Sequence, residues 1–378
     1  MPIGGSKLRR QVKLFKIEML PAGYGDCIYL EYGNPDFPHR ILIDGGPYYA
    51  FQPLAERIKE MAKFDFTFDL LVVTHVDSDH VDGIVKLLGS NVSNLKNGVG
   101  DIWFNAWKHF EKDPEDLLGP LQGEMLSSLI EENELTWNQA FDDKAVANPN
   151  SSTLIRKDLP GGLKLTLLSP TKEELAKLKT VWIREVRKAG LEPGSRDQVL
   201  QLLSEDLRLQ PKDLLGEKSF DVSSLGSSQF EAEDSRTNAS SIAFLVEYEG
   251  KKFIFAGDAH PDVMTASIKQ FLDQRGEQSL KIDGFKLSHH GSKNNTSPDL
   301  LNLLCCKKFF ISSNGSRYQH PDPETVARII KQNGPGVELF FNYNSTENSI
   351  WSDRTLQQHY RYKACYPPKR KEGLTILF

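Results

Sequence analysis

Histidine and aspartate are concentrated in one short segment of the chain, His75-Val76-Asp77-Ser78-Asp79-His80. Four of these side chains are potential metal ligands, and carboxylates buried without a partner would be costly. Imidazole nitrogens and carboxylate oxygens are ligands of Zn²⁺, and a compact turn directs alternate residues toward two adjacent ions. We therefore expect His75 and Asp77 to face one metal ion. Asp79 and His80 are expected to face the other.

Two later segments carry residues of the same kinds. Asp258 follows an apolar stretch at Gly257-Asp258-Ala259, where a carboxylate is able to bridge two cations about 3.5–4 Å apart. The segment His289-His290-Gly291-Ser292-Lys293 follows another apolar stretch. Because adjacent histidines at a strand end point in different directions, we expect His290 to be a ligand and His289 to face the substrate.

Each of these segments follows a predicted buried strand. Strands are predicted at 12–17, 27–32, 40–43, 69–73, 163–168, 241–246, 252–255, 280–287 and 309–312, and helices at 54–62, 84–88 and 263–272. The first three strands are separated by glycine turns, which predicts antiparallel hairpins. Strands followed by helices in both halves predict an α/β (α+β) fold of two packed sheets with helices outside.

The middle of the chain does not fit this pattern. Residues 171–215 are charged and predicted to be helical, and residues 216–237 are rich in Ser, Asp and Glu, a composition typical of disorder. We interpret 171–237 as an insertion over the site within a hydrolase domain of residues 1–330. Residues 331–378 are interpreted as a C-terminal extension that packs on this domain.

Composition limits the remaining possibilities. The 378 residues are 26% charged and 39% hydrophobic, as in a globular protein, and no apolar run is long enough to span a membrane. The net charge of −5 does not favour polyanion binding by the chain as a whole. The four cysteines form no CxxC pair, which favours reduced thiols and a cytoplasmic location.

The motifs around 72–83, 255–259 and 286–293 together resemble those of metallo-β-lactamase-fold hydrolases. The branch they resemble most is the hydrolase (nuclease) domain of the bacterial DNA-uptake protein ComEC. Supporting similarities are Gly25-Asp26, Ile43-Asp44-Gly45-Gly46 and Tyr318-Gln319-His320-Pro321. The resemblance covers most of residues 12–110 and 163–330. It implies an αββα sandwich of two mixed sheets with helices on the outside and the metal ions at one edge.

The resemblance also carries expectations for individual residues. It implies that Asp44 steadies the histidine loop from outside the ligand set. Many relatives supply another histidine ligand from the middle of the chain. Between Gly83 and Gly257 this sequence contains a single histidine, His109. His109 is the candidate by elimination, although its surroundings do not match the usual motif and a structural role is the alternative.

These residues predict a metal-dependent hydrolase with two Zn²⁺ ions, and the carboxylate-rich set also suits Mn²⁺. Asp79 and Asp258 are expected to be essential to a phosphodiesterase or nuclease that uses a metal-activated water. His289, Lys293 or His320 would contact the phosphate or protonate the leaving oxygen. Asn294 and Asn295 would contact the substrate or cap a helix near Pro298.

The resemblance makes nucleic acid, and single-stranded DNA in particular, the favoured partner among phosphodiester substrates. A second hypothesis is hydrolysis of small esters, lactones or phosphoesters at the same site. A third, from another class, is a module that senses a ligand for a partner protein, although nothing in the sequence indicates such a partner. A redox di-iron role is disfavoured because the first cluster contains no glutamate.

Overall fold

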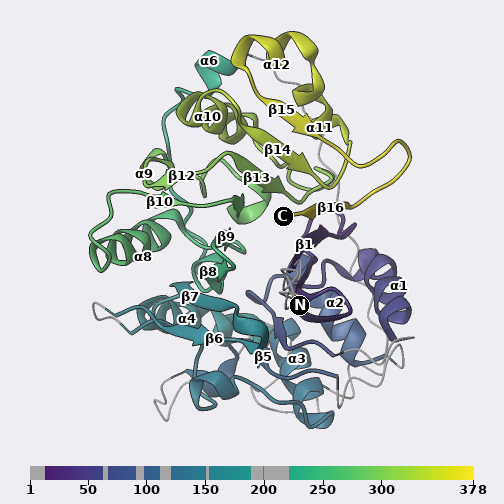
Figure 1. The fold of residues 1–378 in the computed structure, drawn as a ribbon. Coiled ribbons are helices and arrows are strands. Elements are labelled where there is room, and N and C mark those ends of the chain that lie inside the picture. The colour runs from purple at the N-terminus through teal and green to yellow at the C-terminus, as the bar shows by residue number, and fades with distance from the viewer. Residues whose placement is uncertain are drawn as a thin grey trace, which may run out of the picture.

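A computed structural model of the chain describes residues 13–62, 67–90, 98–110, 121–149, 153–188, 199 and 221–378. Much of the predicted insertion, residues 189–198 and 200–220, lies outside the described residues. Two large mixed sheets pack against each other in the described part, with helices against their outer faces (Figure 1). The αββα architecture expected from the sequence is therefore confirmed.

The first sheet has six strands in the order β16-β1-β2-β3-β4-β5. Its strands are β1 (Leu14–Met19), β2 (Ile28–Asn34), β3 (Phe37–Ile43), β4 (Leu70–Val72), β5 (Ile102–Trp103) and β16 (Leu374–Leu377). Strands β16, β1, β2 and β3 pair antiparallel, whereas β3, β4 and β5 pair parallel. The predicted hairpins are therefore present, and the sheet continues beyond them in parallel.

The second sheet has eight strands in the order β15-β14-β13-β11-β9-β8-β7-β6. They are β6 (Arg156–Asp158), β7 (Lys164–Ser169), β8 (Ala243–Tyr248), β9 (Lys251–Phe255), β11 (Gly284–Lys286), β13 (Lys308–Ile311), β14 (Glu338–Phe341) and β15 (Lys363–Cys365). Strands β6 to β9 pair antiparallel and β9 to β15 pair parallel. Strands β10 (Leu280–Lys281) and β12 (Leu304–Cys305) form a separate parallel pair.

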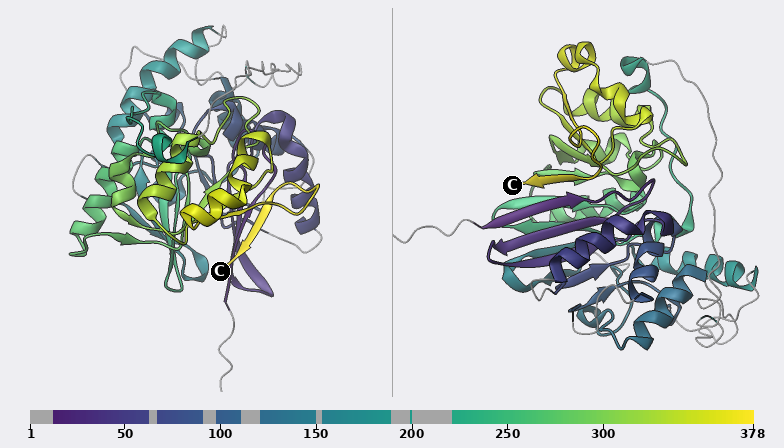
Figure 2. Two further views of the ribbon diagram at one scale, coloured as in Figure 1. Left: turned by 90° about the horizontal axis from the view of Figure 1, so that it is seen from above. Right: turned by 90° about the vertical axis from the view of Figure 1, so that its right-hand side faces the viewer.

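Three layers of buried apolar side chains hold the sandwich together. Successive strand residues point to opposite faces, so Phe244 lies between the two sheets while Leu245 faces the outer helices. Helices α1 (Phe51–Ala62), α2 (Ser78–Leu88), α3 (Leu121–Glu132) and α4 (Lys172–Lys188) belong to the layer on the first sheet. Helices α8 (Pro261–Asp273), α9 (Pro298–Asn302) and α10 (Pro323–Asn333) cover the second (Figure 2).

The remaining helices are short: α6 (Val222–Leu225), α7 (Arg236–Ala239), α11 (Thr346–Ser349) and α12 (Arg354–Tyr360). Among the described residues, no helix has the length and apolarity needed to cross a membrane. The segment 331–378, predicted to be an extension, places β14 and β15 at one edge of the second sheet and β16 at one edge of the first.

Two local predictions were wrong. The single strand predicted at 280–287 is interrupted at Asp283, whose carboxylate accepts a hydrogen bond from the backbone of Lys252. As a result β10 and β11 belong to different sheets. The composition of 216–237 is typical of disorder, yet α6 lies within residues 221–237 and α7 begins there, with its N-terminus capped by the Ser235 side chain.

Candidate metal centre

The histidine and aspartate segments lie at the carboxyl ends of strands from both sheets. His75 to His80 follow β4 and continue into α2, and Asp258 and His290 follow the parallel neighbours β9 and β11. The backbone N–H of Ile242 donates to the Thr74 carbonyl over 2.9 Å, which joins the two sheets at this edge. Three regions distant in sequence therefore converge at one place.

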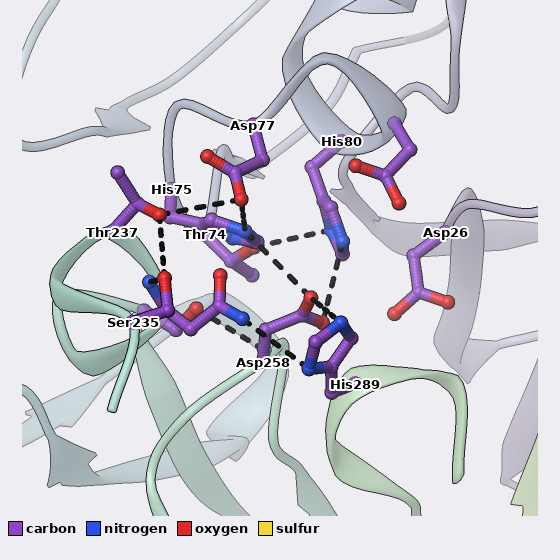
Figure 3. Close-up of polar contacts among 12 residues, drawn as sticks. Asp26, Thr74, His75, Asp77, His80, Ser235, Thr237, Asp258 and His289 are labelled. Atoms are coloured by element: carbon purple, nitrogen blue, oxygen red, sulfur yellow. Dashed lines mark hydrogen bonds and ion pairs between the residues drawn. The ribbon is translucent and has the colours of Figure 1, made fainter. Parts of the chain in front are cut away.

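One group of potential ligands consists of His75, His80 and Asp258, all of which are buried. The Asp258 carboxylate lies 3.7 Å from Nε2 of His75 and 3.3 Å from Nε2 of His80. Asp77, whose side chain is 38% exposed, lies at the open side with its carboxylate 3.6 Å from Nε2 of His75. Figure 3 shows these side chains pointing toward one another.

A second set of contacts is centred on His290. Its Nε2 lies 3.2 Å from the Asp79 carboxylate and 3.9 Å from that of Asp258. Asp26, His80 and His290 also form a group in which ligand atoms come close together. Oδ2 of Asp26 forms a buried ion pair with Lys286, whereas its Oδ1 lies 3.3 Å from Nδ1 of His290 and has no hydrogen-bond partner among the described residues.

Hydrogen bonds at Nδ1 fix the orientation of the buried histidines. Nδ1 of His80 donates to the Asp44 carboxylate over 2.8 Å, and Nδ1 of His290 donates to the Ser312 carbonyl over 3.0 Å. The Thr74 hydroxyl donates to Asp44 and accepts from Nδ1 of His75. Each ring consequently directs its Nε2 toward the cluster, the usual orientation of a metal-binding histidine.

The unpartnered atoms of the cluster fit divalent cations. Nε2 of His75, His80 and His290, and Oδ1 of Asp258, are buried without a hydrogen-bond partner among the described residues. Leaving such polar atoms unpaired is costly, whereas imidazole nitrogens and carboxylate oxygens together are a ligand set for Zn²⁺ and similar ions. The residues present therefore fit a metal centre in which Asp258 faces both sets of histidines.

The electrostatic field of the cluster also favours positive charge. Burial alone would lower the pKa of His290, but the carboxylates of Asp258 and Asp26 outweigh it and raise that pKa to about 9. Burial would likewise raise the pKa of Asp258, yet the surrounding imidazoles hold it well below its ordinary range. The carboxylates are therefore ionised, and their combined charge attracts cations.

His289 lies beside this cluster and is contacted by residues that the sequence did not single out. Its Nδ1 is 2.7 Å from the Glu233 carboxylate, and its Nε2 is 3.8 Å from Asp258. Asn238 donates to Glu233, and the Asn295 side chain donates to the Asp258 carbonyl. Glu233, near the end of the predicted insertion, and Asn238, directly after it in α7, therefore border the site. No sequence pattern marked these residues.

The helix near Pro298 is capped by a different residue from those expected. The Ser297 side chain accepts from the backbone N–H of Leu300 at the start of α9. Asn295 instead lies fully buried beside Asp258. The capping alternative offered for Asn294 and Asn295 was therefore wrong, because a serine directly before the helix fills that role.

His320 and Lys293, which were expected to contact the phosphate or the leaving oxygen, belong to neither group of potential ligands. His320 is buried 5.2 Å from the His289 ring and pairs with Asp322 over 3.4 Å. The Lys293 amino group lies 3.9 Å from Glu324, and the Lys293 side chain is half exposed.

His109 belongs to neither group of potential ligands. Its ring packs 4.7 Å from that of Trp137, and its Nδ1 accepts from the backbone of Ala106. It lines a separate cavity of about 880 Å³ together with Phe110 and Phe141. The alternative of a structural histidine therefore describes its position.

Comparison with known proteins gave structural similarity alone. No protein-family model matches the sequence, and no curated protein matches it. The chain is similar in structure to CmlA, a diiron β-hydroxylase from Streptomyces venezuelae, with 10% identity, a TM-score of 0.38, and 98% of this chain aligned to 55% of that one. A mutant of the CmlA β-hydroxylase gives a TM-score of 0.37 at 10% identity, with 100% and 55% of the two chains covered.

A third similar structure is the metallo-β-lactamase-fold protein YhfI from Bacillus subtilis, at 8% identity and a TM-score of 0.36. It aligns over 97% of this chain and 100% of its own. The chain spans about half the length of CmlA but the whole of YhfI.

Proposed function

We propose that the chain is a metal-dependent hydrolase that cleaves phosphodiesters, with single-stranded nucleic acid as its substrate. The observation that supports this most is the set of three buried imidazoles anchored at Nδ1, whose unpartnered Nε2 atoms converge on Asp258. His75, Asp77 and Asp258 would hold one cation. Asp79, His80, His290 and Asp258 would hold the other.

Bound divalent cations would supply an activated water at neutral pH and would neutralise charge on a transferring phosphoryl group. The protein's own residues orient the reactants. Asp44 fixes His80, and Glu233 fixes the His289 ring beside Asp258. His289 and His320 lie close enough to each other to contact the same phosphate or leaving group.

The proposal is tested by activity on a panel of substrates with Zn²⁺ or Mn²⁺ added. We expect turnover of labelled single-stranded DNA and of bis-p-nitrophenyl phosphate. Asp258→Asn is expected to reduce this turnover about 10³-fold, because it removes a carboxylate that faces both ligand sets. The matched control is Asp262→Asn, an exposed aspartate four residues along the chain in the first turn of α8, which should behave as wild type.

The other functions weighed from the sequence give different results in the same panel. Turnover of lactones or carboxylic esters without any phosphodiester cleavage would overturn the nuclease proposal and favour a small-molecule hydrolase. A protein that contains no metal and remains inactive after reconstitution would favour a ligand-sensing module.

A further inference from the structure

Exposed aromatic side chains gather close to the metal centre. The large apolar or aromatic side chains most exposed in the described part of the chain are Phe37, Tyr48, Tyr49, Tyr318 and Leu377. Tyr48 and Tyr49 begin the segment after the Asp44 loop, and Tyr318 lies between β13 and α10. The exposed fractions of these three tyrosines are 44%, 54% and 49%, respectively, which is unusual for three rings in neighbouring loops.

Tyr49 and Tyr318 belong to a series of neighbouring rings that leads to the metal centre. The Tyr49 ring lies 5.8 Å from that of Tyr24, and Tyr24 lies 6.3 Å from Tyr318. The series continues from Tyr318 to His320 over 6.0 Å and from His320 to His289 over 5.2 Å. The loop that carries Tyr24 is also pressed against α2, since a Cβ added at the next residue, Gly25, would lie 1.9 Å from the Asp79 carbonyl oxygen.

A positive charge lies among the same rings. The Arg317 guanidinium is 5.2 Å from the Tyr24 ring centre and 5.0 Å from that of Tyr318, and its Nη1 donates to the Tyr24 hydroxyl over 2.9 Å. No acidic side chain of the described residues forms an ion pair with Arg317. A second positive charge, the Lys86 amino group, lies 3.8 Å from the Tyr48 ring centre.

We propose that Tyr49, Arg317 and Tyr318 bind single-stranded nucleic acid and lead it to the metal centre. The exposed rings of Tyr49 and Tyr318 would stack on unpaired bases, and Arg317, held in place by Tyr24, would bind a backbone phosphate. This inference rests on the proposed function for its choice of substrate. The aromatic rings and the guanidinium match the two chemical features of a single strand, exposed base faces and repeated negative charge.

Binding is tested by fluorescence anisotropy with a labelled oligodeoxythymidylate whose phosphorothioate linkages resist hydrolysis. Replacing either exposed ring, in Tyr49→Ala or Tyr318→Ala, should weaken binding about tenfold, the typical effect of losing one stacked base. Tyr318→Trp should retain affinity because it retains a ring. The matched control is Phe37→Ala, which removes a ring that is 81% exposed in the β2–β3 hairpin and should not change affinity.

An abasic oligonucleotide of equal length separates stacking from charge. The wild type should bind it more weakly than Tyr318→Ala binds oligodeoxythymidylate, because neither ring then has a base to stack on, and the tyrosine substitutions should cause no further loss. Arg317→Ala should weaken binding to both oligonucleotides and reduce the slope of log affinity against log salt by about one.

The inference is overturned if the tyrosine variants bind oligodeoxythymidylate as tightly as the wild type. It is also overturned if they lose equal affinity for the abasic strand, or if the wild type binds no oligonucleotide, in which case the rings would serve a protein partner instead. Binding that depends on the rings, without any cleavage of ordinary DNA, would leave this surface intact and contradict the proposed hydrolysis. Cleavage of single-stranded DNA at the wild-type rate by the ring variants would support the proposed hydrolysis and contradict the role proposed for this surface.

Discussion

At the scale of single residues, the chemistry of the site depends on how each imidazole is anchored. The buried rings of His75, His80 and His290 use Nδ1 for an internal hydrogen bond and direct Nε2 toward the carboxylates. A satisfied core histidine would have both nitrogens paired, because an unpaired buried nitrogen is costly. Three such rings directed at neighbouring carboxylates therefore mark this edge of the sandwich as the candidate metal centre.

His109, by contrast, lies outside this cluster and occupies the position of a structural histidine. Burial is the main reason that the pKa of His109 is lowered to about 3, and the nearby Lys108 charge contributes in the same direction. The ring is therefore neutral in the folded protein. In the unfolded chain its pKa would be about 6.5, so the unfolded state binds the extra proton between these two values. The stability of the folded state should therefore fall as the pH drops from about 6.5 toward about 3.

His109→Gln should remove this contribution. Between about pH 7 and pH 4, the free energy of unfolding of the wild type should fall more than that of the variant, by on the order of 2 kcal/mol. Urea denaturation of both proteins at several pH values measures the difference. His109→Gln should also contain as much metal as the wild type, and the loss of one ion per chain would return His109 to the ligand set.

The residues that could be predicted from sequence were those that occur in compact clusters. His75 to His80 and the pair His289-His290 stand out because several ligand types lie within a few positions. Glu233 could not be found in this way, because it lies in a segment rich in Ser, Asp and Glu that has no periodic pattern. Its contact with His289 spans 56 residues and arises only from the fold.

At the scale of elements, α2 is held close to the loop after β3, and this contact aligns Asp44 with His80. The backbone N–H of Gly45 donates to the His80 carbonyl over 2.8 Å, and that of Gly83 donates to Gly46 over the same distance. A Cβ added at Gly83 would lie 1.9 Å from the Gly45 carbonyl oxygen. No side chain can be accommodated there without moving the helix.

Gly83→Ala should therefore lower the free energy of unfolding by about 2 kcal/mol or more, as overpacked positions do. It should also reduce metal binding, because displacement of α2 separates His80 from Asp44. Gly89→Ala is the control: Gly89 follows the same helix with an ordinary φ of −80°, and an added Cβ would come no closer than 3.2 Å to its neighbours. Urea denaturation with metal analysis compares the two, and equal stabilities would contradict the account.

Elements with clear periodicity were also the ones that could be predicted. The helix expected at 263–272 is α8, and the strands expected at 241–246 and 252–255 are β8 and β9. The stretch from 280 to 287 shows the limit of apolar patterning. Ile282 and Asp283 divide it, and Gly284, the first residue of β11, packs so closely on Phe310 that an added Cβ would lie 2.4 Å from that ring. Such tertiary contacts cannot be recognised from the local sequence.

At the scale of the whole molecule, the last strand completes the first sheet. β16 pairs antiparallel with β1, so residues 374–377 lie beside residues 16–19. The Phe378 ring extends this contact into the space between the sheets, 4.6 Å from that of Phe253. This long-range pairing was not predicted, because a four-residue strand carries too little pattern to reveal its partner.

The importance of this pairing is tested with two adjacent residues. Ile376 is 8% exposed and belongs to the layer between the sheets, whereas Leu377 is 69% exposed. Ile376→Ala should lower the free energy of unfolding by about 2 kcal/mol or more, and Leu377→Ala by less than about 0.5 kcal/mol. Thermal or chemical denaturation provides the comparison, and equal effects would mean that β16 does not stabilise the sandwich.

The sandwich brings the loops after β4, β9 and β11 to one edge, and the central claim is that they hold two metal ions there. Elemental analysis of the purified protein, reconstituted with Zn²⁺ or Mn²⁺ and freed of excess metal, tests this most directly. We predict two ions per chain in the wild type and in Asp262→Asn, and one or fewer in Asp258→Asn. Wild-type protein that retains no metal, or Asp258→Asn that retains both ions, would contradict the account.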